Sequence, residues 1–314
     1  MKPTAVIAIG GNSLISDQGR TTVADQYAAV VEACGHIGAL LASRDLNLVV
    51  THGNGPQVGF ILRRSELAAP ELHMVPLDSC VADTQGALGY QLQCALGNEF
   101  RKRQLARAAV TVVTQVRVDE ADPAFQAPNK PIGSFLSAEV ARLHQARDGW
   151  QLVEDAGRGW RRVVASPQPR EVVELDQIRT LLAAGAVTIA CGGGGIPVAR
   201  DAQGELRGVA AVIDKDLASS LLAQQLGAEM LVISTAVEQV CLDYGTPSQR
   251  SLSVMTLAEA RQYIREGHFK PGSMLPKVQA VVDFLEHGGR EAIITDPSHL
   301  SAAFQGQGGT RIIP

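Results

Sequence analysis

The sequence predicts an α/β fold in which a mainly parallel sheet is covered by helices on both faces. Short runs that are apolar throughout alternate with longer stretches in which apolar residues recur at helical spacing. Strands buried on both faces, as in a parallel sheet, are typically apolar along their whole length. Glycine-rich loops follow several of these runs, and open α/β sheets bind ligands beyond the carboxyl ends of their strands.

The first half of the chain twice shows the order strand, Gly/Asn loop, helix. Its last strand comes after a long helical region in which Asp83, Gln85 and Tyr90 are expected to form a buried polar face. The expected elements are a strand at 5–9, a helix at about 24–41, a strand at 46–51, a helix through 58–62, a mostly helical region at 75–105 and a buried strand at 109–114.

The regular alternation breaks between Arg117 and Arg170, where five prolines and both tryptophans occur, and we interpret this region as an insertion. It contains Lys130 between two prolines, on a stiff loop or an ordinary surface turn. After it the alternation resumes. The expected elements are a helix from 176 to about 184, strands at 187–191, 229–234 and within 237–244, helices at 256–265 and from about 271, and closing strands at 291–295 and 310–313.

Composition excludes several classes of protein. The 314 residues are 46% hydrophobic, enough to bury a core, and 28 Lys and Arg against 32 Asp and Glu give a net charge of −4 without charged blocks. A nucleic-acid or anionic-membrane surface is therefore not expected. Five scattered cysteines without a C-x-x-C pair fit reduced thiols, and no apolar run approaches the roughly 18 residues of a membrane span. We expect a soluble cytoplasmic protein without a signal peptide.

The stretch from Ile189 to Ala218 combines a strand end, four glycines and a helix start. Cys191, read as a core residue, precedes the glycines at 192–195, whose backbone must approach another group closely or adopt positive φ. Further on, Lys215 lies between Asp214 and Asp216, either of which could cap the helix. A cation and carboxylates are thereby expected at a helix N-terminus, where free N–H groups favour anions. The expected apolar stripe of this helix is Leu217, Leu221, Leu222 and Leu226.

Three glycine loops at strand ends, at 10–12, 53–55 and 192–195, suit a phosphate or carboxylate ligand, or else form tight turns. None matches the P-loop or the dinucleotide-binding pattern, so cations for a phosphate must come from elsewhere. Asn12 and Asn54 could donate amides to a small planar anion, or could occupy left-handed turn positions. His52 is read as a structural turn histidine rather than a base.

Lysines are few, and three of the six, Lys130, Lys215 and Lys277, lie in rigid or capped contexts. Each alone could be an ordinary ion-paired surface residue. Phosphoryl transfer depends on positioning and on neutralising negative charge that is spread over several oxygens. A helix N-terminus supplies only about 0.3–2 kcal/mol, whereas enzymes lower barriers by roughly 8 kcal/mol or more. Such chemistry would therefore need several lysines together with a metal ion.

These motifs together resemble the carbamate kinases, a family within the amino-acid kinase superfamily. The resemblance runs from Ala5 to Ile313 and rests on the segments 9–14, 51–59, 81–86, 130–133, 192–197, 212–216 and 271–277. It implies a three-layer αβα sandwich with an open, mainly parallel sheet, formed by residues 1–314 as one domain with a protruding inserted subdomain, or lid, at 118–168. It also implies a homodimer and the Mg²⁺-dependent reaction ATP + carbamate ⇌ ADP + carbamoyl phosphate, run toward ATP in catabolism.

The resemblance also implies roles for individual residues. The catalytic group is Lys215, Lys277, Lys130, Asp216 and, less directly, Asp214. The loops that hold carbamate and the transferred phosphoryl group contribute Gly10, Gly11, Asn12, Gly53 and Asn54. The residues expected to border the nucleotide are Gly193, Gly194, Ser234, Ala236, Val237, Tyr244 and Met274. Protein side chains are not expected to provide the Mg²⁺ ligands. Ser13 and Asp296 depart from residues common in the family.

Three alternatives remain open from the sequence. Another member of the superfamily that phosphorylates a carboxylate would share the same motifs, and a rate with other acyl phosphates would identify it. A non-catalytic regulator that binds carbamoyl phosphate or nucleotide would bind ADP without turnover. A dinucleotide oxidoreductase would bind NAD(H), although the chain lacks the corresponding fingerprint. Nothing in the sequence pairs a base with Ser219 or Cys191 for nucleophilic catalysis.

Overall fold

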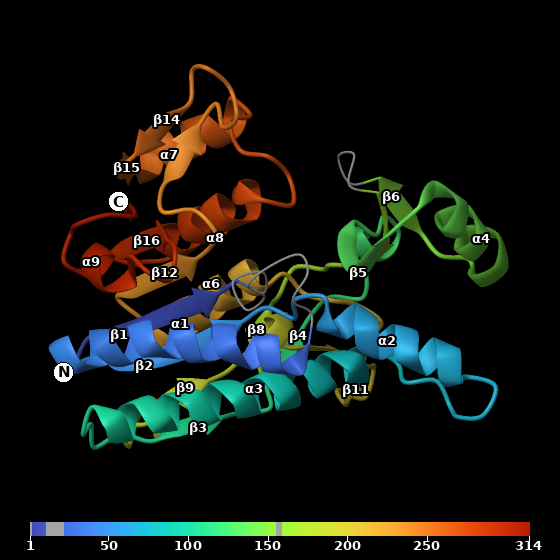
Figure 1. The fold of residues 1–314 in the computed structure, drawn as a ribbon, viewed down its shortest axis with the longest axis horizontal. Coiled ribbons are helices and arrows are strands. Elements are labelled where there is room, and N and C mark those ends of the chain that lie inside the picture. The colour runs from blue at the N-terminus through green and yellow to red at the C-terminus, as the bar shows by residue number, and fades with distance from the viewer. Residues whose placement is uncertain (1, 11–21, 155–158) are drawn as a thin grey trace.

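The computed structural model describes residues 2–10, 22–154 and 159–314 and has a central eight-stranded sheet (Figure 1). Neighbouring strands of this sheet are parallel except at one pair, β16 with β17. The mainly parallel sheet expected from the sequence is therefore confirmed. Across the sheet the order is β15 (Val254–Thr256), β17 (Thr310–Ile313), β16 (Glu291–Thr295), β12 (Met230–Ser234), β1 (Thr4–Ile9), β2 (Asn47–His52), β9 (Val187–Ile189) and β3 (Ala109–Thr111).

The central strand β1 explains why the strands read as uninterrupted apolar runs. Side chains alternate between the two faces of a strand. Ala5, Ile7 and Ile9 enter one apolar cluster, while Val6 and Ala8 enter another on the opposite face. Both faces are buried because helices cover both sides of the sheet, which makes the fold a three-layer αβα sandwich.

The two helical layers differ in their members. The first layer packs on the β1 face that carries Ile7, and the second packs on the face that carries Val6. The first layer consists of α1 (Val23–Ser43), α3 (Leu77–Lys102) and α9 (Leu300–Phe304), and the second of α5 (Leu175–Ala183), α6 (Lys215–Leu226), α7 (Leu257–Arg265) and α8 (Met274–Glu286).

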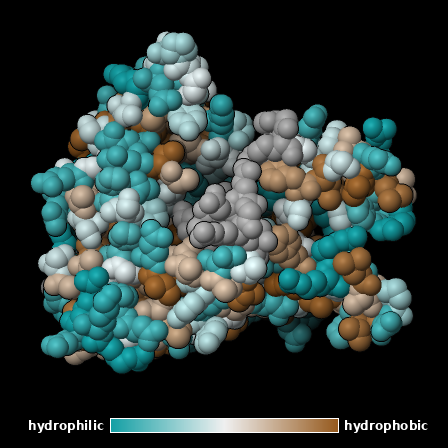
Figure 2. Space-filling model, in the orientation of Figure 1, coloured by the Kyte–Doolittle hydropathy of each residue, from teal (hydrophilic) through white to brown (hydrophobic). Residues whose placement is uncertain are grey.

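A small antiparallel sheet and a helix project from the body beside α2 (Gln57–Ala68), and we call residues 130–164 the arm (Figure 1). Apolar side chains gather on its surface (Figure 2), and Phe135 and Leu143 are among those exposed. The arm lies within the predicted subdomain at 118–168, whose boundaries stay a prediction. The arm consists of β5 (Lys130–Leu136), α4 (Ala138–Asp148), β6 (Leu152–Glu154) and β7 (Trp160–Val164).

Further elements complete the described chain outside the central sheet. A four-stranded sheet has the order β11, β10, β4, β8, and β13 pairs with β14 as a hairpin. These elements are β4 (Gln115–Arg117), the 3₁₀ turn η2 (Pro123–Phe125), β8 (Glu171–Val172), the 3₁₀ turn η3 (Gly192–Gly194), β10 (Ile196–Arg200), β11 (Leu206–Gly208), β13 (Val240–Leu242) and β14 (Arg250–Leu252).

Two local expectations differ from the structure. The run predicted as one strand at 109–114 forms a strand only at Ala109–Thr111; the Val112 N–H still donates to Ile189, but the Thr114 N–H donates to the Gln85 side chain. The buried face of α6 consists mainly of small residues such as Ala218 and Ala223, whereas Leu217 is only partly buried. Small residues allow this helix to lie close to the sheet.

The remaining expectations concern thiols and membranes. Cys34, Cys80 and Cys191 are buried, and the other two cysteines are partly exposed and also free. Within residues 2–10, 22–154 and 159–314, none of the helices combines the length and apolar character that crossing a bilayer requires.

Candidate active site

The glycine loops that follow β1, β2 and β9 lie at one edge of the central sheet. The backbone N–H of Gly10 donates to the carbonyl of Ser234 at 3.1 Å, and that of Gly53 donates to Ile9 at 3.1 Å. These bonds continue the pairing of β1 with both of its neighbours, so the loops leave the sheet side by side. Gly11 and Asn12, which were predicted to hold the substrate, lie outside the described residues.

The side chain of Asn54 is fixed at this edge by residues from two other elements. Its Nδ2 donates to the carbonyl of Gly193 at 3.1 Å, and its Oδ1 accepts a hydrogen bond from the Thr84 hydroxyl of α3. Asn54 is 7% exposed, so these contacts are largely shielded from water. The amide thereby links the β2 loop to the glycine loop after β9.

The four glycines at 192–195 are required by close packing as well as by backbone conformation. Gly193, Gly194 and Gly195 have φ of +69°, +96° and +88°. A Cβ on Gly193 would lie 2.1 Å from Asn54 Oδ1, and one on Gly194 would lie 2.3 Å from the Ile213 carbonyl. The glycines therefore show both features expected from the sequence, positive φ and close approach to another group, and that group belongs to the protein itself.

Gln85 fastens the same loop to α3. Its Nε2 donates to the carbonyls of Thr114 and Gly192, both at 2.9 Å, and its Oε1 accepts the Thr114 N–H at 2.9 Å. Gln85 is 1% exposed, as expected for a buried polar helix face. Asp83 and Tyr90 are exposed, so the expectation was wrong for these two residues, which lie on the opposite face of α3.

Lys215 and Lys277 meet at a single carboxylate. The Lys215 ammonium, at the start of α6, donates to Oδ1 of Asp216, and the Lys277 ammonium, in the first turn of α8, donates to Oδ2 at 2.9 Å. The Asp216 side chain is 3% exposed, and those of the two lysines are 10% and 17% exposed. Two neighbouring residues of α6 and one residue of α8, 61 positions further along the chain, thus form one cluster, here called the lysine cluster.

The pKa values of Asp216 and Lys215 are shifted by burial and by the other charges of the lysine cluster. Burial alone would raise the pKa of Asp216, but the two ammonium groups prevail and hold its pKa well below the usual value. Burial lowers the pKa of Lys215, and Lys277 adds to this effect while Asp216 opposes it. Asp216 is therefore ionised at neutral pH. With both lysines protonated, the cluster carries one positive charge in excess, which favours an anion nearby.

Asp214 connects the arm to the start of α6. Its Oδ1 accepts the backbone N–H of Asp216 at 2.9 Å, so Asp214 is the N-cap residue that the sequence left open between two aspartates. Its Oδ2 accepts the ammonium of Lys130, the first residue of β5. The structure thereby brings all five residues predicted as catalytic to the N-terminus of α6.

His52 lies next to this charge and is itself neutral. Complete burial is the main cause that lowers its pKa to about 4, and Lys215 lowers it further, against the opposing effect of the Gly53 carbonyl. The Nδ1–H of the ring donates to this carbonyl at 3.1 Å. A neutral, hydrogen-bonded ring agrees with the interpretation of His52 as a structural turn residue.

The residues predicted to border the nucleotide are more dispersed. Ser234 ends β12 and is buried, and Met274 begins α8 one turn before Lys277. Ala236 and Tyr244 are exposed, and Val237 is partly buried. The structure thus places Ser234 and Met274 on elements that adjoin the site, while Tyr244 lies beyond β13.

Comparison with known proteins identifies the family. The model of the amino acid kinase family matches residues 3–296. The chain belongs to the amino acid kinase family. It is 51% identical over 316 residues to "Carbamate kinase-like protein YahI" of Escherichia coli, covering 100% of this chain and 99% of the relative. It is 46% identical to "Carbamate kinase 2" of Enterococcus faecalis over 94% of both chains. A solved carbamate kinase from Giardia lamblia, bound to AMP-PNP, is 41% identical with a TM-score of 0.91, covering 99% of this chain and 98% of that one.

Some residues that build the site in this amino acid kinase were not singled out from the sequence. Thr84 donates to Asn54, and Thr114 Oγ1 accepts the N–H of Cys191 at 3.0 Å. Thr51 and Ser219 share a hydrogen bond of 2.6 Å between β2 and α6. Helical spacing along α3 would have placed Thr84 on the buried face with Val81 and Leu88. No comparable signal marks Thr114 or Thr51.

We predict that Gly193→Ala strongly impairs the site, because its Cβ would lie 2.1 Å from Asn54 Oδ1. Gly185→Ala is the matched control, since Gly185 has a similar φ of +83° with nothing within 4 Å of the added Cβ. The control is expected to cost about 1 kcal/mol of unfolding free energy for its positive φ. Gly193→Ala should cost clearly more in urea unfolding. Equal losses would show that the contact with Asn54 is unimportant.

We predict that His52 makes stability depend on pH. The pKa of His52 is about 4 in the folded state and about 6.5, the ordinary histidine value, in the unfolded chain. Between these pH values the unfolded chain therefore binds more protons than the folded protein. The contribution is fully present above about pH 6.5 and is lost as the pH falls toward 4, by on the order of 3 kcal/mol. His52→Gln should flatten the pH dependence of the unfolding free energy by this amount.

The matched control is His73→Gln, at an exposed position. It should leave the pH dependence of stability as it is in the unchanged chain. If His52→Gln also leaves the dependence unchanged between pH 4 and 6.5, the neutral buried imidazole is not its source.

Proposed function

We propose that this protein is a carbamate kinase that catalyses ATP + carbamate ⇌ ADP + carbamoyl phosphate. The main support for this proposal is the lysine cluster. In it, two ammonium groups from α6 and α8 share the buried carboxylate of Asp216, near the glycine loops. Full-length relatives 43–51% identical to this chain, named carbamate kinase or carbamate kinase-like, support the choice of substrate.

The proposed chemistry is a direct in-line transfer without a covalent enzyme intermediate. A carbamate oxygen attacks the γ-phosphorus of ATP, and the bond from this phosphorus to the bridging oxygen breaks, so that ADP leaves. In the reverse direction a β-phosphate oxygen of ADP attacks the phosphorus of carbamoyl phosphate, and carbamate leaves. The transferred group carries negative charge on its equatorial oxygens, so fixed positive charges stabilise the transition state. Lys215 and Lys277 supply these charges, and Asp216 holds the two ammonium groups in place before substrate arrives.

The predicted substrate loops contribute main-chain and amide groups around the same point. Gly10 and Gly53 leave adjacent strands, and Asn54 is held by Thr84 and Gly193. We assign these loops, together with the predicted Gly11 and Asn12, to carbamate and the transferred phosphoryl group. A carboxylate-like anion fits between backbone N–H groups at the end of parallel strands.

Lys130 is proposed to reach over the bound substrate from the arm, within the predicted lid at 118–168. Its ammonium already lies at Asp214, the N-cap of the helix that carries Lys215. A substrate phosphate could take the place of Asp214 as the partner of Lys130. The arm would then contribute both to binding and to turnover, as lids do.

Nucleotide and metal complete the proposal. We propose that the nucleotide contacts Ser234 at the end of β12 and Met274 at the start of α8, and that the other contacts are the predicted Gly193, Gly194, Ala236, Val237 and Tyr244. In the described part of the chain, no group of three or more His, Cys, Asp or Glu side chains could hold a metal ion. Mg²⁺ usually binds through one or two carboxylates, waters and substrate phosphates. We propose that Mg²⁺ is held mainly by the nucleotide, where it would neutralise phosphate charge.

The remaining features of the proposal rest on the resemblance to the family. They are a homodimer, a cytoplasmic location and net flux toward ATP in catabolism. A −4 net charge without charged blocks supports the expectation of no nucleic-acid or membrane partner.

The function is tested by incubating the protein with carbamoyl phosphate, ADP and Mg²⁺ and following the formation of ATP. We expect ATP with carbamoyl phosphate and little with acetyl phosphate at the same concentration. A higher rate with acetyl phosphate or another acyl phosphate would instead identify a different carboxylate kinase. Binding of ADP without any turnover would identify a regulator.

Lys277→Ala is expected to lower kcat by on the order of 10²-fold, as does removal of one preorganised charge at a transition state. Lys102→Ala is the matched control, since the Lys102 side chain is 73% exposed on α3. The control should retain full activity, and circular dichroism should show both variants folded. A folded Lys277→Ala variant with near-normal turnover would remove Lys277 from the mechanism.

A further inference from the structure

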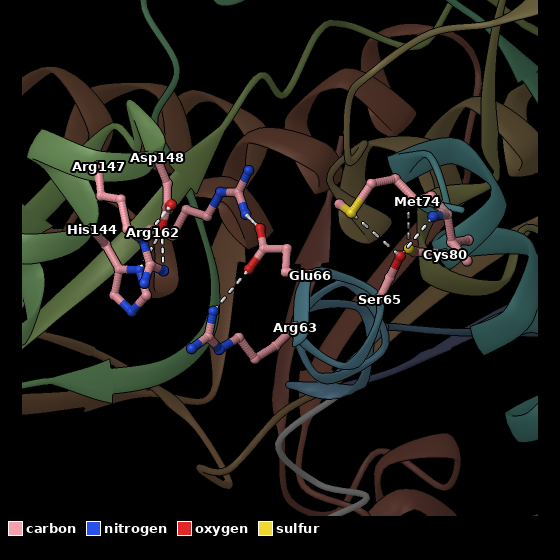
Figure 3. A network of polar contacts seen from close by, with 10 residues as sticks. Arg63, Ser65, Glu66, Met74, Cys80, His144, Arg147, Asp148 and Arg162 are labelled. Atoms are coloured by element: carbon pink, nitrogen blue, oxygen red, sulfur yellow. Dashed lines mark hydrogen bonds and ion pairs between the residues drawn. The ribbon is translucent and has the colours of Figure 1, made fainter. Parts of the chain in front are cut away.

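A group of polar and aromatic residues joins the arm to α2, and Figure 3 shows four of them, Arg63, Glu66, His144 and Arg162. We call it the arm–α2 cluster; it consists of Arg63, Glu66, His144, Trp150 and Arg162. Glu66 of α2 accepts hydrogen bonds from Arg162 of β7 and, at 3.4 Å, from Arg63 of its own helix. The side chains of Glu66 and Arg162 are 16% and 26% exposed. Partly buried pairs are screened less by water and salt than exposed pairs.

Trp150 extends this group into the rest of the arm. The Arg162 guanidinium lies 4.6 Å from the centre of its ring, and that of Arg63 lies 5.9 Å from it, within the range of cation–π attraction. The His144 ring stacks on Trp150 at 4.1 Å between centroids and 8° between planes, and His144 Nδ1 contacts Asp148 at 2.6 Å. The cluster thus connects α2 with β7 and α4.

A second contact between the arm and α2 lies closer to the sheet. A Cβ on Gly59 of α2 would lie 2.3 Å from the backbone of Gly133 in β5, so the two main chains touch. Beside this contact, Ile132 and Val164 of the arm pack with Val58 of α2 in a small apolar cluster. Gly133 has φ of +70°, which a glycine can vary at little cost.

A cavity of about 160 Å³ separates the two contacts. Its walls come from both sides of the junction and include Leu62, Ile132 and Trp150. Because the junction is not closely packed there, apolar packing alone does not fix the angle of the arm. One contact at Gly59 and Gly133 would allow the arm to pivot, whereas a second contact at Glu66 and Arg162 fixes its orientation.

The orientation of the arm determines where Lys130 lies. Lys130 begins β5 three residues before Gly133, and β5 pairs with β7 so that Ile132 faces Arg162 and Lys130 faces Val164. A displacement of Arg162 therefore moves the strand next to Lys130. In the structure this lysine reaches Asp214, at the start of the helix that carries Lys215.

We propose that Glu66 and Arg162 are positioning residues for the reaction, which hold the arm on α2 so that the Lys130 ammonium stays at the site. This inference rests on the proposed function, because it acts through the role given there to Lys130. Neither residue contacts the lysine cluster, and both act through the geometry of β5 and β7.

The test is a double-mutant cycle between Glu66 and Lys130, assayed as ATP formation from carbamoyl phosphate and ADP. Glu66→Gln keeps the size of the side chain and removes the charge, and it should lower kcat roughly fivefold through imperfect positioning. In the Lys130→Ala background the same change should have little further effect, because the ammonium it positions is gone. A merely structural role would give the same factor in both backgrounds, and this result would overturn the proposal.

Glu286→Gln is the matched control. Glu286 pairs with Arg261 between α8 and α7, remote from the arm, with side chains 34% and 49% exposed. It should leave kcat unchanged in both backgrounds. Urea unfolding is measured for each variant, so that loss of folded protein is not mistaken for loss of positioning.

A second readout does not depend on turnover. The chain has two tryptophans, so Trp160→Phe leaves Trp150 as the sole indole. In this background Glu66→Gln should increase quenching of Trp150 fluorescence by acrylamide, and Glu286→Gln should not. Unchanged quenching with Glu66→Gln would overturn the proposal. If the unchanged protein forms no ATP, the proposed function is wrong, and the quenching alone then decides whether the cluster holds the arm.

Discussion

The arrangement of the site depends on the carboxylate of Asp216, which lies between two ammonium groups in a nearly water-free position. Two lysines this close, one buried and one partly buried, would repel each other and lose hydration without a shared counter-charge. The Asp216 carboxylate provides this counter-charge and accepts a hydrogen bond from each lysine with a different oxygen. Asp216 can contact both lysines because Asp214 caps the first turn of α6 and because α8 begins beside this turn. The sheet order then brings the loops after β1 and β2 to the same edge.

The glycine loop after β9 shows that a glycine run can be required by the protein's own packing. Gly192 lies against His52, Gly193 against Asn54, and Gly195 against Val116, at distances that exclude any side chain. The close approach allows Asn54 and Gln85 to bind the loop carbonyls directly. The loop is consequently a rigid support for the neighbouring loops, whatever ligand it also contacts.

The sequence allowed much of the fold to be predicted, because strands buried on both faces and amphipathic helices leave local patterns. The start of α6 was also predictable, since a capping aspartate is a local signal, although only the structure distinguishes Asp214 from Asp216. The pairing of Lys130 with Asp214 spans 84 residues and leaves no local pattern. Lys130 was therefore assigned to the site from the family resemblance and not from residue spacing. Thr114, which leaves the sheet to bind Gln85, could not be predicted for the same reason.

The position of β1 has a consequence for how the molecule is made. This strand lies in the middle of the sheet, yet it is synthesised before the other strands of that sheet, and its neighbour β12 follows far later, as the hydrogen bond between Thr4 and Glu229 across 225 residues illustrates. Until then β1 can pair with β2 along one edge, while its other edge lacks its partner β12. Long-range pairing of this kind slows folding and exposes strand edges. The order of synthesis thus leaves one edge of this apolar strand without its partner until residues 230–234 have been made.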